Sequence, residues 1–219
     1  MSEKKSEPLA SDRAIEAAEK AGGWADTVFG EGFRQLGAAF ADSMAGLRAR
    51  NRLRVLQKTQ KAIDDAGLTG ATRPLNERMH LPLLEAISEE SDEGLQDVWA
   101  AYIRSAVDPR KPNPDRVLIG VIRGLEPGDW PLLQKLFSAG CNGSPNQDFG
   151  MSDADLEQSL DRLTQLGLFD YDDPSSAYLV AGRHMDGRLS IKVGDAAYYG
   201  NKLLRKLADA VSSASGDLR

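Results

Sequence analysis

The sequence predicts a mainly α-helical protein that closes with a β-hairpin and a last helix. Over most of the 219 residues, apolar side chains recur every three or four positions, which places them on one face of a helix. An Asp-Gly pair at residues 186 and 187 lies between two stretches of strand-forming residues, which is a strong hairpin signal. A hydrophobic fraction of 41% is enough for a core, and an aromatic fraction of 6% indicates that this core is aliphatic.

The first half of the chain is predicted to be a helical region over residues 13–111. A polar tail at residues 1–12 precedes it, and we expect that tail to be disordered. Helical patterns begin at Ala14, break at two glycines and resume at Trp24. A further helix runs to a C-cap at Gly67, residues 70–76 form a loop, and another helix covers residues 92–107.

The second half, residues 112–212, is predicted to be a separate unit. The segment at residues 108–115 carries three prolines and is the predicted hinge, and residues 213–219 form a disordered tail. Helices are expected at residues 117–125, from a cap at Asp129, from a cap at Ser152, and at residues 195–211. Strands are expected at residues 178–185 and 188–193. The order of helix, helix, hairpin and helix is typical of a winged helix-turn-helix with the hairpin as its wing.

The composition excludes several classes of site. The single cysteine, Cys141, rules out an internal disulfide and a thiolate zinc site. Two histidines, His80 and His184, are too few for a histidine-based metal centre. The polar start is not a secretory signal, and no run is apolar enough to cross a membrane, so we expect a cytoplasmic protein. We therefore identify no candidate catalytic, cofactor-binding or metal-binding residues in the sequence. We expect a protein that is not an enzyme and has no small-molecule substrate.

A basic run is the first candidate interaction surface. Residues 48–61 contain six positive charges and no negative one, and Arg50, Arg54 and Lys58 share a helix face. This face could contact phosphate, an anionic lipid or an acidic partner. Alternatively, it is a solvated face paired with the acidic turn at residues 89–97, which the net charge of −6 favours.

Two apolar patterns predict that the protein forms homo-oligomers through its N-terminal helices. Gly37, Ala41 and Ala45 make a stripe of small residues that allows close helix approach. Beside the basic face runs an apolar seam, which could pack against another subunit as in a coiled coil. The seam consists of Ala49, Leu53, Leu56 and Ile63.

DNA recognition is not expected. The helix that would enter the major groove, residues 152–166, carries four acids against one base, Arg162, and acids facing phosphates repel them. The predicted wing carries Arg183 and Arg188, but a wing alone positions a protein without specifying sequence. Charged residues spread around the helix at residues 21–47 likewise leave no wide apolar face to enter a membrane.

The order of several short motifs resembles the prokaryotic abortive-infection alpha family, long catalogued as a domain of unknown function. Pro82 opens a P-L-L-E-x-x-S run, an acidic turn follows, and L-Q-D-x-W-A begins at Leu95 before an Asp-Pro at residue 108. The pattern L-x-x-L-G-L begins at Leu163, and the similarity extends from about Leu53 to Leu204.

That resemblance implies a phage-defence protein with a C-terminal hairpin and closing helix. We expect a non-enzymatic module or effector that binds a protein, with a protein made by the phage as one candidate. Two alternatives remain: a transcriptional regulator that uses the winged helix, and an effector that perturbs membranes through residues 21–47.

Overall fold

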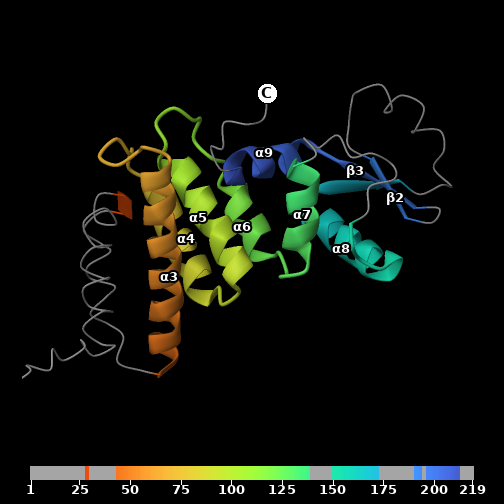
Figure 1. Ribbon diagram of the computed structural model, residues 1–219, viewed down its shortest axis with the longest axis horizontal. Helices are drawn as coiled ribbons and strands as arrows, with labels where there is room; N and C mark the ends of the chain where they lie inside the picture. Colours follow the sequence, from red (N-terminus) through yellow and green to blue (C-terminus); the bar gives the residue numbers. More distant parts are fainter. Residues whose placement is uncertain (1–27, 30–42, 139–148, 173–189, 194–195, 213–219) are drawn as a thin grey trace, which may run out of the picture.

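The structure is a computed structural model that describes residues 28–29, 43–138, 149–172, 190–193 and 196–212. Its described part is mainly helical, with a small antiparallel sheet at one end (Figure 1). The elements in chain order are α3 (Ser43–Asp65), α4 (Glu77–Glu89), α5 (Glu93–Val107), α6 (Val117–Arg123), α7 (Asp129–Ser138), α8 (Asp153–Gln165), β1 (Phe169–Asp172), β2 (Ser190–Val193), β3 (Ala196–Gly200) and α9 (Lys202–Val211).

Helix α5 forms the centre of the core and confirms the helix predicted at residues 92–107. Asp92 caps it by accepting a hydrogen bond from the Leu95 amide at 2.9 Å. Trp99 and Tyr102 are fully buried, and their rings meet edge to face with centroids 6.2 Å apart. The two aromatic residues therefore belong to the core. Helices α3, α6 and α9 all pack against α5.

Helix α4 differs from its prediction. Pro82 was expected to break a helix at the start of the apolar run, but it lies inside the helix, which begins at Glu77 behind an Asn76 cap. Proline removes one backbone donor there. Burial of Leu83, Leu84 and Ile87 against the neighbouring helices compensates for that loss.

Helix α3 buries part of the predicted seam within its own chain. Leu56 and Ile63 are 2% exposed, whereas Ala49 is exposed and Leu53 half-buried. The buried face is completed by Val55 and packs on α4 and α5. Gly67 follows with a φ of 64°, as the C-cap prediction requires.

The sheet corrects the prediction for the C-terminal end. Its strand order is β1-β3-β2, all antiparallel, with Phe169 opposite Gly200 and Ser190 opposite Tyr199. Residues 196–200 were expected to begin the last helix, but they form the central strand. Tyr198 in this strand is 1% exposed and donates a hydrogen bond to Asp161 in α8. Contacts with distant segments therefore determine that residues 196–200 form a strand and not a helix. Helix α9 begins only at Lys202, after an Asn201 cap.

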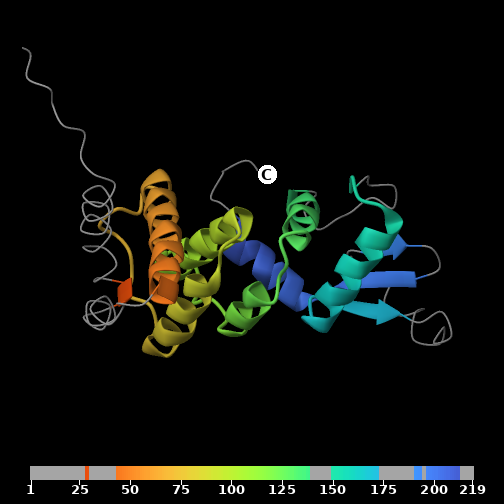
Figure 2. The same cartoon turned by 90° about the horizontal axis from the view of Figure 1, so that it is seen from below.

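The hydrophobic core continues across residues 111 and 112. Helix α9 packs beside α5, as both views show (Figures 1 and 2). Arg73 holds the proline-rich linker in place by donating to the carbonyls of Ala106, Lys111 and Pro112 at 2.9, 2.9 and 3.0 Å. The division into two domains at this point stays a prediction. The expected tails and the Asp-Gly turn lie outside the described residues.

Among the described residues, none of the helices combines the length and apolar character that a membrane crossing requires.

Candidate functional site

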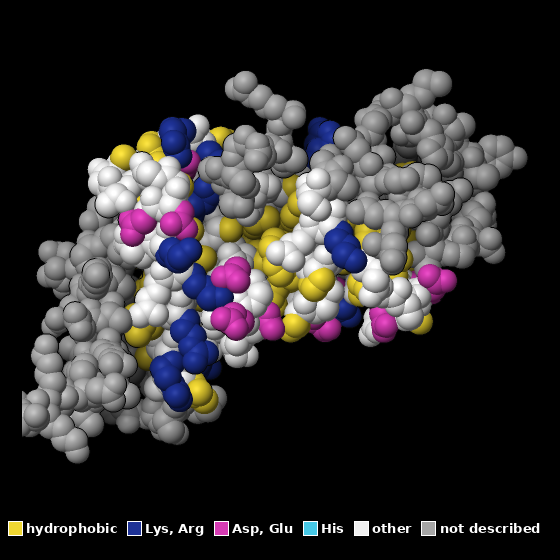
Figure 3. Space-filling view, in the orientation of Figure 1, with side chains coloured by type: hydrophobic (Ala, Val, Ile, Leu, Met, Phe, Trp, Pro, Cys, Tyr) yellow, Lys and Arg dark blue, Asp and Glu magenta, His cyan; other side chains and the backbone are white. Residues whose placement is uncertain are grey.

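The N-terminal half of α3 carries three arginines, Arg48, Arg50 and Arg54, which we call the arginine face. Arg50 and Arg54 lie one turn apart on the same side of the helix, and Arg48 projects at a different angle around it. All three side chains are exposed. Figure 3 shows Lys and Arg side chains gathered over this part of α3. Arg50 Nε donates to the Gly46 carbonyl one turn earlier at 3.3 Å. Within the described part of the chain, no carboxylate forms an ion pair with any of the three. This face can therefore receive an anionic group without first breaking an ion pair.

Lys58 was predicted to share that face, but it acts within the chain. Its Nζ lies 2.6 Å from Asp97 Oδ1 and donates to the Glu93 carbonyl at 2.9 Å. The lysine is 25% exposed and ties α3 to α5. Two acidic side chains of the turn also bind groups within the chain. Glu89 forms an ion pair with Arg123 at 2.6 Å, and Asp92 caps α5. Of the expected pairing between the basic run and the acidic turn, the Lys58–Asp97 contact is the one that forms.

Of the remaining predicted residues, Leu56 is the one whose side chain the structure describes. Leu56 lies in the core of the described chain. Ala45 belongs to the first turn of α3, and nothing describes its side chain. The other four predicted residues lie outside the described residues: Gly37, Ala41, Arg183 and Arg188.

Helix α8 shows an acidic outer face and a basic residue that is already engaged. Asp153, Asp155 and Glu157 are exposed. Arg162 instead forms a two-pronged pair with the fully buried Asp129, at 3.0 Å from Nε and 2.8 Å from Nη2. These hydrogen bonds raise the pKa of Arg162. The only basic side chain of α8 is therefore held against α7 and does not face a groove of DNA.

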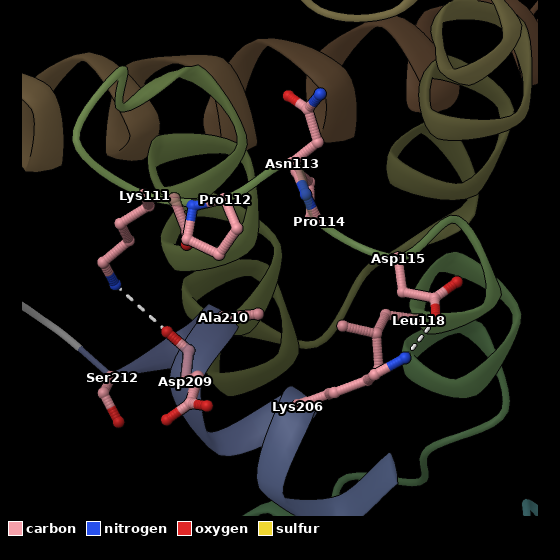
Figure 4. Close-up of a pocket in the computed structure, with 11 residues that line it drawn as sticks. Lys111, Pro112, Asn113, Pro114, Asp115, Leu118, Lys206, Asp209, Ala210 and Ser212 are labelled. Atoms are coloured by element: carbon pink, nitrogen blue, oxygen red, sulfur yellow. Dashed lines mark hydrogen bonds and ion pairs between the residues drawn. The ribbon is translucent and has the colours of Figure 1, made fainter. Parts of the chain in front are cut away.

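A second candidate site lies between the proline-rich linker and α9. It is a cleft of about 690 Å³, within the range of roughly 300–1,000 Å³ that is usual for small-molecule sites. Lys111, Pro112 and Pro114 come from the linker, and Lys206 and Asp209 come from α9 (Figure 4). Leu118 and Ala210 add apolar surface.

The lysines of this cleft have different partners. Lys206 Nζ lies 2.7 Å from Asp115 Oδ2, and together with the Val117 amide it lowers the pKa of Asp115. Lys111 Nζ donates to the main-chain carbonyl of Asp209 at 3.0 Å. Burial, followed by the nearby Arg104, lowers the pKa of Lys111. The cleft thus holds one neutralised lysine and one that contacts an uncharged acceptor.

Sequence reasoning missed the cleft because its two walls lie about 90 residues apart. The segment at residues 108–115 was interpreted only as a hinge. Its combination of prolines with Lys111 and Asp115 was the one available signal, but nothing in the sequence indicated that α9 would face it.

No group of three or more His, Cys, Asp or Glu residues in the described chain could hold a metal ion. Comparison with protein-family models, curated proteins and solved structures finds no match to this chain.

Proposed function

We propose that the chain is a non-enzymatic phage-defence protein of the abortive-infection alpha type, which acts in the bacterial cytoplasm by binding another protein. The observation that carries this proposal is the arginine face, three exposed cations on one helix without an ionic partner in the described chain. Arginine is enriched at protein interfaces because its planar head forms paired hydrogen bonds with carboxylates. The partner is therefore an acidic protein surface, made by the phage or by another copy of this chain.

The C-terminal part serves as a winged-helix-like support for that surface in this proposal. Helices α7 and α8, the small sheet and α9 follow the order of such a module. The acids of α8 would face the phosphates of bound DNA, and Arg162 would have to leave Asp129 to reach a base. Both features favour protein binding over the alternative of a transcriptional regulator.

Charge reversal on the arginine face tests this function. We expect cells that carry the protein to suppress phage plaques, and cells with the double variant Arg50→Glu, Arg54→Glu to plate phage like cells without the protein. Each reversed charge repels an acidic partner, and like charges facing each other at an interface cost several kcal/mol. The measurement is the efficiency of plating, with accumulation of both proteins checked by immunoblot.

The matched control is the double variant Arg78→Glu, Lys202→Glu. It makes the same charge change at two exposed residues on α4 and α9, away from the arginine face. Protection should survive in this control. If both double variants protect equally well, the arginine face is not the functional surface.

A further inference from the structure

The cleft between the linker and α9 has walls that are fixed by the fold. The Arg73 guanidinium group binds the linker carbonyls of Lys111 and Pro112 and the Ala106 carbonyl near the end of α5, which holds the proline wall in one conformation. Arg104, which is 2% exposed, donates to the Ser212 carbonyl at 2.7 Å and anchors the end of α9 to α5. A pocket whose walls are already ordered loses little conformational entropy when it binds.

Ser105 supplies a hydroxyl group on the wall of the cleft. The residue lines the cleft and is 5% exposed. None of the hydrogen bonds in the described chain uses this hydroxyl group, and its oxygen is not among the fully buried atoms that lack a partner, so it is open to the cleft. A hydrogen-bonding group of a bound molecule would satisfy it.

The charge around this end of the cleft favours an anion. Asp108 is neutralised by two hydrogen bonds from Arg110, and Asp115 by Lys206. Arg104 and Lys111 donate to main-chain carbonyls, which carry no net charge. The exposed carboxylate of Asp209 offsets the positive charge of one of these two side chains. The full set has four cations and three carboxylates: Arg104, Arg110, Lys111 and Lys206 against Asp108, Asp115 and Asp209.

We propose that this cleft binds a small organic anion with an apolar body. The negatively charged group lies at Lys111 and Ser105, and the apolar body packs on Pro112, Pro114, Leu118 and Ala210. This site shares no residue with the arginine face: α5, the linker, α6 and α9 line the cleft, whereas the arginine face lies on α3 at one edge of the described fold (Figure 1). The binding of the anion therefore does not depend on the proposed function.

Two fluorescent probes test this proposal on the full-length protein. Anilinonaphthalene sulfonate is an anion with an apolar body, and phenylnaphthylamine has the same ring system without the charge. We expect saturable binding of the sulfonate at one site and weaker binding of the neutral probe. Lys111→Met should weaken sulfonate binding about tenfold, because a hydrogen bond to a charged group is worth roughly 1.4 kcal/mol or more. The affinity for the neutral probe should stay unchanged.

Two further variants make the result decisive. Ser105→Ala removes only a hydroxyl group that has no partner in the described chain, so it should fold normally and still weaken sulfonate binding. Lys202→Met removes an exposed lysine of α9 that does not line the cleft, so it should bind like the wild type. Absence of saturable sulfonate binding by the wild type, or equal affinities in all four proteins, overturns the proposal.

Discussion

Replacing Arg162 with alanine is expected to destabilise the protein by about 3–5 kcal/mol, the range for breaking one side of a buried ion pair. Asp129 is fully buried, and two of its hydrogen bonds come from Arg162. Without the guanidinium group, the one donor that its carboxylate keeps among the described residues is the Glu126 amide at 2.9 Å. The charge would then be buried without compensation. Urea denaturation, followed by circular dichroism, measures the change in unfolding free energy.

Two companion variants separate lost charge from lost geometry. Arg162→Lys keeps the charge but cannot form the two-pronged contact, so its loss should be intermediate. The double variant Arg162→Met, Asp129→Leu removes both charges and should recover much of the stability that Arg162→Ala loses. An Arg162→Ala protein within about 0.5 kcal/mol of the wild type, the size of an ordinary surface substitution, would contradict the role given to this pair.

Trp99→Ala is the second substitution with a large expected effect, again about 3–5 kcal/mol. The indole ring is fully buried at the centre of α5 and contacts Tyr102 edge to face. Alanine would leave a cavity among helices that are fixed by other contacts. Thermal and urea denaturation should both show the loss.

Trp99→Phe is the matched control for that cavity. No described group accepts a hydrogen bond from the indole Nε1, so tryptophan carries a buried, unsatisfied donor. Phenylalanine removes this donor and keeps most of the aromatic packing, so the loss should stay below about 1.5 kcal/mol. Equal losses in both variants would mean that the indole group, and not the filled volume, determines stability.

The elements predicted well are those governed by local signals. Ser152 caps α8 as expected, because an N-cap side chain needs only the next three residues of its own chain. The buried leucines of α8 likewise follow from helical spacing, and Gly167 ends that region with a φ of 76°.

The features that were missed depend on contacts between distant segments. The strand at residues 196–200 has a sequence compatible with a helix start, and pairing with both β1 and β2 fixes it as a strand. The Asp129–Arg162 pair joins residues 33 positions apart. No periodic pattern records such contacts. For the same reason the sequence offered pairing of the basic run with the acidic turn as an alternative, but it did not single out Lys58 and Asp97 as the residues that meet.

Photocrosslinking from the arginine face tests the central claim, that α3 contacts another protein during infection. Arg54 is replaced by benzoylphenylalanine in the full-length protein, and Arg78, equally exposed on α4, is replaced in a control. Irradiation of infected cells should yield a crosslinked species from the Arg54 position that is absent from the control and is removed by protease. If nuclease treatment removes the crosslinked species, the partner is a nucleic acid and the claim is contradicted. Equal crosslinking at the Arg54 and Arg78 positions would contradict it as well.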